Sequence, residues 1–249
     1  MIILPINQCL QRYNFEFFSF NSTTSTMDEA RFKIDSINKN LIVLANEQTK
    51  GRGRRGNEWV SPPGNIYCSI ALSINLSSKD LFKLTMLTSV AIKRSLEHIG
   101  LADVIFKWPN DVYCYNKKIS GIIQESYLNK LKKKILIIGI GINFLSSPKN
   151  NIYKTTYITE YIKNISLEEY IEIFFNYFFN YFKVFSLNDD TDIILEYKKL
   201  QMFLNTNIKI KVNENKIIEG QFIGINDDGS LMIVKDYKKL SIYSGQILL

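Results

Sequence analysis

Four strand-like runs follow one another between residues 104 and 144 and leave this part of the chain few alternatives to a β-sheet. They read VIFKW, DVYCY, KISGIIQES and KKILIIGIGINF, and turn sequences containing WPND, YNKK and LNKLKK separate them. Short apolar runs that are bounded by turn residues are typical of buried strands. We therefore predict a central sheet here.

Strand-like and helical patterns alternate in the residues around this region. Ser25 is followed three residues later by Asp28, the spacing of an N-terminal cap, so a helix should begin beside that serine. The other predicted elements are strands at 15–20, 41–46 and 65–74 and helices at 79–98, 166–183 and 192–204. This mixture predicts an α+β protein.

After residue 205 the pattern changes to the short alternating runs NIKIKV, KIIEGQFIGI, SLMIVK and LSIYS, with turns between them. Runs of this length and spacing are typical of a small β-barrel. We therefore predict two units, residues 1–205 and 206–249. Because no low-complexity linker separates them, we expect the two units to pack together.

The aromatic-rich segment at 165–185 is nearly long enough to span a bilayer. Its polar residues fall three or four positions apart and form one stripe, which is typical of an amphipathic helix that covers a core. These residues are Glu168, Glu169, Glu172, Asn176, Asn180 and Lys183. The segment therefore predicts a core-covering helix in a protein without membrane association.

The cysteines and the single histidine give no sign of a nucleophile or a zinc site. Cys9, Cys68 and Cys114 are odd in number and widely spaced, and the first residues lack the pattern of a secretory signal. We therefore predict a cytoplasmic protein. Cys68 and Cys114 lie in strand-like runs and His98 lies late in a helix, so packing or surface roles are expected for them.

The formal net charge of +7 invites comparison with nucleic-acid-binding proteins, because a basic surface attracts phosphate. The lysines are scattered through turns such as KKKI and DYKKL, and no basic recognition helix is present. Specific DNA binding is therefore not expected. A non-enzymatic nucleic-acid binder stays a distant alternative, and salt-dependent affinity for any duplex without ATP consumption would mark it.

The sequence GRGRRG at 51–56 formally fits the dinucleotide-binding pattern GxGxxG. That pattern must open a helix, but Pro62 and Pro63 follow too closely for a long helix to begin, and no GK[ST] closes a Walker loop. What remains is a glycine-rich loop with Arg52, Arg54 and Arg55, whose forked donors suit carboxylate and phosphate oxygens. By itself, an isolated arginine-rich loop of this kind is more often a solvated basic turn than an anion-binding loop.

The sequence KWPND at 107–111 places a lysine at the end of an apolar strand, before a proline-fixed turn. Lys107 is therefore expected to point into the cleft that borders this edge of the sheet. The alternative is a surface turn that caps itself through Asn110 and Asp111.

Taken in order, the segments TSTMDEA, EQTKGRGRRGNEW, KWPND, KISGIIQE and IGIGINF resemble the biotin protein ligase family, from about residue 24 to the end of the chain. The resemblance implies a central mixed β-sheet flanked by helices and a C-terminal small SH3-like β-barrel. It also implies that biotin is activated with ATP to biotinyl-5'-AMP and transferred to a lysine of a biotin carboxyl carrier protein, such as that of acetyl-CoA carboxylase. A lipoate or octanoyl ligase or transferase of related architecture is the alternative.

Some family members carry an N-terminal DNA-binding domain and repress biotin genes. About fifteen residues precede the first predicted strand here, too few for such a domain, so a monofunctional ligase is expected. Whether the chain forms a homodimer is left open.

The resemblance implies a role for each residue that matches a family motif. The biotin pocket matches Ser25, Thr26, Met27, Gln48, Lys118 and Gly121. The loop that closes over biotin and the adenylate phosphate matches Gly51, Arg52, Gly53 and Arg54, with Trp59 packing at the nucleotide end. The phosphate and adenine side matches Lys107, Asn110 and Asn143.

Lys107 and Arg54 are the expected catalytic residues, because the carboxylate of biotin must attack the α-phosphate although both groups are anionic. Magnesium is expected on the phosphates of ATP, with protein ligands that the sequence does not identify.

Overall fold

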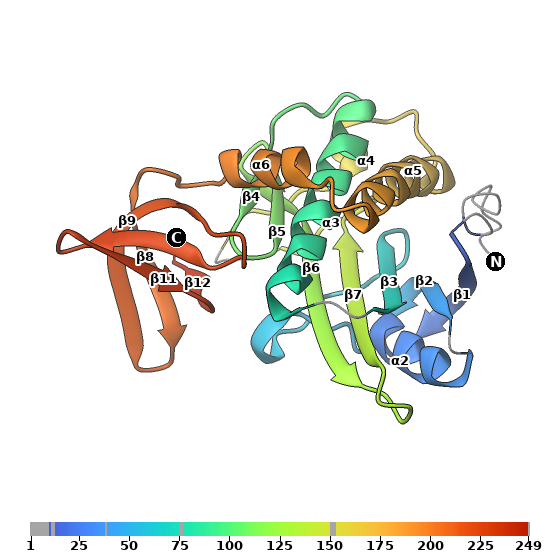
Figure 1. The fold of residues 1–249 in the computed structure, drawn as a ribbon. Helices are drawn as coiled ribbons and strands as arrows, with labels where there is room; N and C mark the ends of the chain where they lie inside the picture. Colours follow the sequence, from blue (N-terminus) through green and yellow to red (C-terminus); the bar gives the residue numbers. More distant parts are fainter. Residues whose placement is uncertain (1–9, 11–12, 38, 75–76, 150–152, 249) are drawn as a thin grey trace.

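The structure is a computed structural model that describes residues 10, 13–37, 39–74, 77–149 and 153–248. Within these residues the strands form two sheets, a larger one and a smaller C-terminal one (Figure 1). The strands of the larger sheet are β1 (Phe15–Thr23), β2 (Asn40–Gln48), β3 (Ile66–Ser73), β4 (Val104–Lys107), β5 (Asp111–Cys114), β6 (Lys117–Leu128) and β7 (Lys134–Ile142).

The seven strands lie in the order β1-β2-β3-β7-β6-β5-β4. β1 and β2 are parallel and the other neighbours are antiparallel, so the predicted mixed sheet is confirmed. All four runs between residues 104 and 144 are strands of this sheet. The α-helices of the described residues are α2 (Thr26–Ile37), α3 (Ser78–His98), α4 (Ile158–Tyr161), α5 (Leu167–Ser186) and α6 (Thr191–Lys199), and the glycine-rich loop contains the short 3-10 helix η1 (Arg54–Gly56).

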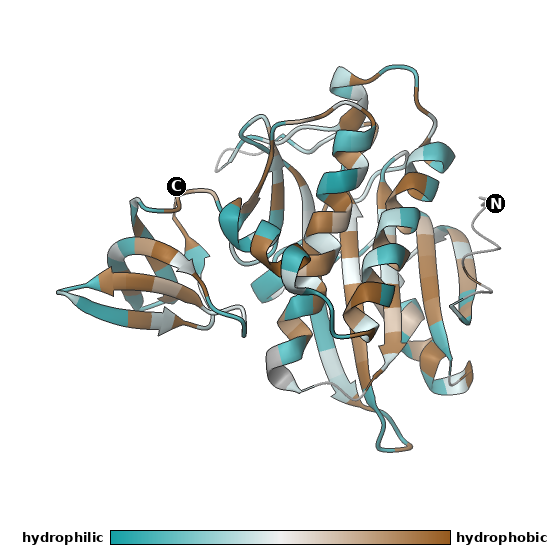
Figure 2. Ribbon diagram, turned by 45° about the horizontal axis from the view of Figure 1, so that its top comes forward, coloured by the Kyte–Doolittle hydropathy of each residue, from teal (hydrophilic) through white to brown (hydrophobic). Residues whose placement is uncertain are grey.

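Helices cover both faces of the larger sheet, because successive side chains of a strand point to opposite sides. In β2, Leu41 and Val43 pack with Ile34 of α2, whereas Ile42 and Leu44 belong to the core that α3 and α5 cover. Hydrophobic colouring runs along these strands in Figure 2, while the helices alternate between hydrophobic and hydrophilic residues. The chain therefore forms a three-layer α/β/α arrangement around one sheet.

Helix α5 is the aromatic-rich segment, and its pattern is that of a core-covering helix, as predicted. Ser166 caps it, accepting a hydrogen bond from Glu169 N over 3.1 Å. The buried face consists of Tyr170, Ile171, Phe174, Phe175, Phe178 and Phe179. None of the helices in the described ranges has both the length and the apolar character that crossing a membrane requires.

Helix α6 ends at Lys199, so the prediction that it continues to residue 204 was wrong. The residues after it pair with the edge strand β4 instead. Phe106 N donates to Leu200 O over 2.8 Å and Met202 N donates to Phe106 O over 2.7 Å. These bonds to the sheet replace the i to i−4 bonds that a longer helix would need.

The C-terminal sheet consists of β8 (Asn207–Asn213), β9 (Lys216–Ile225), β10 (Leu231–Lys235), β11 (Lys238–Ile242) and β12 (Gln246–Ile247). The order is β11-β10-β9-β8-β12 and all neighbours are antiparallel. The four predicted runs are strands, and β12 and the short α4 were not predicted. The strands form the small SH3-like unit, but no pairing of its edge strands β11 and β12 closes it among the described residues. The boundary at 205/206 stays a proposal.

The C-terminal unit packs against the turn between β4 and β5 and is hydrogen-bonded to it. The Trp108 indole is buried and donates from Nε1 to Gly229 O over 2.8 Å. Gly229 has φ of +81°, and a Cβ built on it would lie 2.1 Å from the Phe82 ring in α3. A Cβ on Gly245 would meet Trp108 at 3.5 Å. The tryptophan of KWPND is therefore one of the residues that anchor this unit, a role that the sequence did not reveal.

Candidate active site

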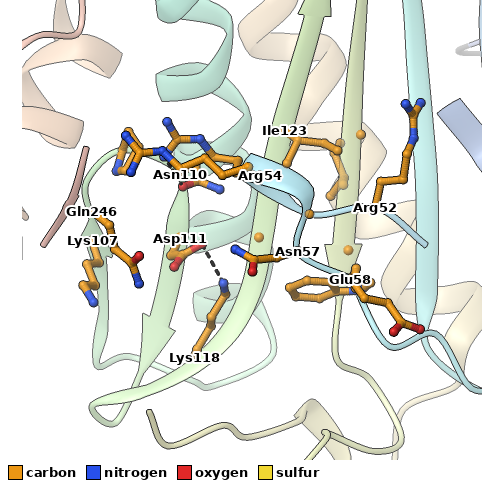
Figure 3. A pocket seen from close by; sticks show the side chains of 18 of the residues that line it. Arg52, Arg54, Asn57, Glu58, Lys107, Asn110, Asp111, Lys118, Ile123 and Gln246 are labelled. Atoms are coloured by element: carbon orange, nitrogen blue, oxygen red, sulfur yellow. Dashed lines mark hydrogen bonds and ion pairs between the residues drawn. The ribbon is translucent and has the colours of Figure 1, made fainter. Parts of the chain in front are cut away.

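A pocket of about 380 Å³ lies among the start of α2, the glycine-rich loop, the β4–β5 turn, the middle of β6 and β7, and β12. That volume lies in the range of small-molecule sites. All but two of the predicted site residues line it: Ser25, Thr26, Met27, Gln48, Arg52, Gly53, Arg54, Trp59, Lys107, Asn110, Lys118 and Gly121. Figure 3 shows Arg54, Asn110, Asp111 and Lys118 gathered on one side of this space, whereas Arg52 extends away from them.

The floor of the pocket is made of strand glycines on which the Trp59 ring lies. A Cβ on Gly141 would approach the indole to 2.4 Å, and a Cβ on Gly121 would approach it to 2.9 Å. Only glycine at these positions lets the ring lie across β6 and β7. Trp59 Nε1 lies against Gly141, is buried, and has no hydrogen-bond partner within the described chain.

One wall is a chain of partly buried hydrogen bonds that orients the Gln48 amide. Thr26 donates to Gln48 Oε1 from its backbone N over 2.8 Å and from Oγ1 over 3.1 Å. Gln48 Nε2 donates to Ser61 Oγ over 3.0 Å, and Ser61 Oγ donates to Trp59 O over 2.6 Å. The carbonyl oxygen of Gln48 is thus saturated, and one Nε2 hydrogen is left for a ligand. Ser61 was not predicted as part of the site.

Ser25 and Met27 hold the start of α2 beside this wall. Ser25 Oγ accepts from Met27 N over 3.3 Å and Ser25 O accepts from Glu29 N over 3.1 Å, so the predicted start of the helix at this serine is confirmed. Met27 Sδ would lie 2.7 Å from a Cβ on Gly139. A third strand glycine therefore makes room for Met27.

Lys107 is 6% exposed and has no carboxylate within ion-pair distance in the described chain. Burial lowers the pKa of its ammonium; Asp111 opposes this shift and Lys118 adds to it. Asp111 is already engaged, because Lys118 Nζ lies 2.8 Å from its Oδ1 (dashed in Figure 3). Lys118 also lies between the rings of Trp59, at 5.3 Å, and Tyr153, at 5.2 Å. The charge of Lys107 is thus available to an anionic ligand.

Arg54 is the loop arginine that contacts the β4–β5 turn within the pocket. Its Nη1 donates to Asn110 Oδ1 over 3.3 Å, and burial together with the adjacent Arg55 lowers the pKa of its guanidinium. Asn110 Nδ2 in turn donates to Ile122 O over 2.8 Å, and Ile122 N donates to Asn110 O over 2.9 Å. The turn is closed by Asn110 N, which donates to Lys107 O over 3.2 Å, while the Asn110 side chain is bonded to β6, which places it where it can receive Arg54.

Arg52 is not free to bind an anionic ligand, as the prediction of an anion-binding loop had implied. Its Nη2 lies 2.9 Å from Asp28 Oδ1 and its Nη1 lies 3.0 Å from Glu125 Oε1. Two carboxylates already balance its charge. The three loop arginines thus have separate partners, because Arg55 reaches the C-terminal unit, and only Arg54 offers a free charge to the pocket.

Gly51 and Asn143 do not line the pocket. Gly51 lies at the base of the loop, where a Cβ would come within 2.3 Å of Trp59 O. Asn143 is buried and donates from Nδ2 to Thr156 O over 2.9 Å, so its amide holds the segment after β7, and a contact with adenine stays a prediction. Its backbone N donates to Ile119 O over 2.9 Å.

Further lining residues were not predicted from the sequence. Tyr113 lies on β5, next to the strand that ends at Lys107, and Tyr153 lies in the segment after β7. Gln246 of β12 lies on the same side of the pocket as Lys107 in Figure 3. No motif marks Gln246, because a two-residue strand has too short a pattern to detect.

Comparisons with known proteins agree with this arrangement. Residues 17–143 match the model of the Biotin/lipoate A/B protein ligase family, and residues 203–249 match the Biotin protein ligase C terminal domain. "Bifunctional ligase/repressor BirA" of Bacillus subtilis is 28% identical over 212 residues, which cover 83% of this chain and 65% of that protein. "Biotin--[acetyl-CoA-carboxylase] ligase" of Paracoccus denitrificans is 34% identical over 131 residues, which cover 51% of this chain and 53% of that protein.

Among solved structures, the biotin protein ligase from Aquifex aeolicus in complex with biotin and ATP superposes with a TM-score of 0.75 at 26% identity, covering 93% of this chain and 97% of that chain. The fold and the two domain matches define a two-unit protein of the biotin protein ligase type. The chain belongs to the Biotin/lipoate A/B protein ligase family, as its motifs predicted. It spans about two thirds of the length of the Bacillus relative.

Proposed function

We propose that this chain is an ATP-dependent biotin protein ligase that forms biotinyl-5'-AMP and transfers biotin to a lysine of a biotin carboxyl carrier protein. One observation supports this most: the buried ammonium of Lys107 and the guanidinium of Arg54 face the same pocket as the polar wall at Gln48 and the Trp59 ring. An apolar ring, an amide donor and two unpaired cations suit a bicyclic carboxylic acid beside a nucleotide phosphate.

The cations are needed because the first step brings two anions together. A carboxylate oxygen of biotin bonds to the α-phosphorus while the bond to pyrophosphate breaks, and Lys107 and Arg54 stabilise the charge that develops there. The acceptor amine then attacks the acyl carbon, loses a proton, and AMP leaves. Neither step needs a side-chain nucleophile. His98 is exposed, Cys68 is buried, and the pKa of Cys114 is raised by burial to about 12, which keeps it a thiol.

Magnesium would neutralise the ATP phosphates during this reaction. In the described part of the chain, no group of three or more histidine, cysteine, aspartate or glutamate side chains forms a metal cage. Asp111 and Glu58 are the carboxylates that line the pocket. Magnesium is commonly held by one or two carboxylates together with substrate phosphates; Glu58 could take part in this way, and Asp111 would first have to leave its ion pair with Lys118.

We further propose a cytoplasmic location and an acceptor domain like that of acetyl-CoA carboxylase. DNA binding is not part of the proposed function.

The proposal is tested by ATP–pyrophosphate exchange with biotin, lipoate or octanoate as the only added acid. We expect exchange with biotin alone, because the Gln48 and Thr26 wall offers polar groups that a plain alkyl chain cannot use. Comparable exchange with lipoate or octanoate would favour the related acyl ligase. Transfer is then measured on a biotin carboxyl carrier domain, with the same domain lacking its acceptor lysine as the control.

The pH profile of adenylate formation should show the deprotonation of the Lys107 ammonium. Its pKa lies below the ordinary 10.5 because of burial, so the required charge is present at lower pH and is lost as the pH rises through this lowered value. The alkaline decline of kcat/KM, which reports the free enzyme, should therefore begin below 10.5. The decline of kcat should lie at higher pH, because bound anions stabilise the ammonium.

Lys107→Arg is the control for this assignment, since a guanidinium stays charged throughout the range. Its residual activity should lack the early alkaline decline. An identical decline in both proteins, with unchanged circular dichroism, would assign the titration to another group.

A further inference from the structure

Arg55 is among the residues that line the pocket, and its guanidinium contacts the C-terminal unit. Its Nη2 donates to Val212 O over 3.0 Å and to Ser244 Oγ over 3.1 Å, and its Nη1 donates to Lys211 O over 3.3 Å. These acceptors lie on β8 and directly before β12, two strands that pair with each other. One exposed arginine therefore bridges segments that are 156 to 189 residues apart in the sequence.

The backbone of Arg55 is held in a conformation that it would not adopt without support. Its φ of +56° and ψ of +39° are left-handed, a region that a residue with a Cβ rarely occupies. Such strain persists where the surroundings over-determine the conformation, and the three hydrogen bonds supply that constraint here. Because of this reversal, Arg54 and Arg55 point in different directions although they are neighbours.

The hydrogen bonds of Arg55 to the C-terminal unit complete a ring of contacts around the pocket. Arg54 reaches Asn110 in the β4–β5 turn, and Trp108 of the same turn holds the C-terminal unit through Gly229. That unit, through Ser244, returns to Arg55 and so to the loop. Residues of β12 also line the pocket, so the loop is tied to one of the pocket walls.

We propose that Arg55 is a positioning residue, which ties the glycine-rich loop to the C-terminal unit and thereby sets where Arg54 lies in the pocket. The C-terminal unit then takes part in catalysis through the loop without touching the reacting atoms at this point. The catalytic half of this inference rests on the proposed function, whereas the structural half does not.

The structural half is tested without substrates, by hydrogen exchange of the loop amides of Gly53 and Asn57, whose N–H groups bond within the loop. We expect Arg55→Gln to speed their exchange about tenfold or more, because the loop opens locally once the bridge is lost. Ser244→Ala should have a smaller effect in the same direction, and β3 amides should not change. Arg31→Gln is the matched control, since Arg31 is an exposed arginine that packs on Tyr127 outside this pocket.

Unchanged loop exchange in a folded Arg55→Gln protein would overturn the proposal. If that variant does not fold, Arg55→Lys with Ser244→Ala provides the same comparison, and unchanged exchange there overturns it equally. This result does not depend on biotin, so it is distinguishable from a failure of the proposed function.

The catalytic half is tested by combining variants. Arg55→Gln should lower kcat for adenylate formation about tenfold with an unchanged melting temperature, and Arg55→Lys should restore part of it. In an Arg54→Ala background, Arg55→Gln should have no further effect, because Arg55 acts through Arg54. An equal loss in both backgrounds would overturn the positioning role.

Discussion

Lys107→Ala should slow biotinyl-5'-AMP formation by about two to three orders of magnitude, the effect of removing one preorganised charge donor from a buried site. Lys107 is 6% exposed, and the nearby carboxylate of Asp111 is paired with Lys118, so no other described group neutralises it. Its whole charge is therefore available to the reacting anions. The loss should appear in kcat as well as in kcat/KM, because the charge at phosphorus develops in the transition state.

The same substitution should leave the fold intact and should not lower the melting temperature. A buried ammonium without an ion partner opposes folding, so removing it relieves a cost that offsets the lost packing of the side-chain stem. Activity and stability are thus expected to respond differently, which separates a catalytic role from a structural one.

The measurement is single-turnover formation of biotinyl-5'-AMP from labelled ATP, alongside thermal unfolding followed by circular dichroism. Lys117→Ala is the matched control, since Lys117 is a neighbouring strand lysine that pairs with Glu160 at 2.9 Å and does not line the pocket. A folded Lys107→Ala protein with nearly normal single-turnover rate would contradict the assigned role.

The central sheet was predictable because the local sequence pattern of each strand is sufficient to identify it. β4 to β7 are apolar runs bounded by turn residues, and each run was recognised from its own residues. The end of α6 was not predictable, because the residues after Lys199 keep a helical pattern but find better hydrogen-bond partners on β4. Long-range pairing overrode a local preference there.

The site shows the same division between local and long-range information. The motifs identified Arg54 and Lys107 as residues of the pocket, because each motif carries its own turn chemistry. They did not reveal that Arg52 forms ion pairs with Asp28 and Glu125, since these partners come from α2 and β6. Gln246 was not predicted as a site residue for a similar reason, because only the docking of the C-terminal unit brings it to the pocket.

Arg54→Gly should turn the enzyme into one that releases its reactive intermediate. An acyl-adenylate is an anhydride that must be shielded from water and from stray amines until the acceptor lysine arrives. Arg54 is positioned to hold the phosphate of this intermediate by charge-assisted hydrogen bonds while Asn110 supports its guanidinium at 3.3 Å. Glycine removes that contact and adds flexibility to a loop that already contains Gly51, Gly53 and Gly56.

We therefore expect the Arg54→Gly protein still to consume ATP with biotin, because Lys107 remains, but to lose biotinyl-5'-AMP to solution. Free adenylate labels exposed lysines of any protein nearby, so mass spectrometry of a bystander protein incubated with each enzyme measures the escape. Arg54→Lys is the control, since it retains a charge that can contact phosphate, and it should label the bystander less than Arg54→Gly does. Equal selectivity of the wild type and Arg54→Gly would mean that Arg54 does not hold the intermediate, and that shielding comes from the Trp59 ring and the polar wall alone.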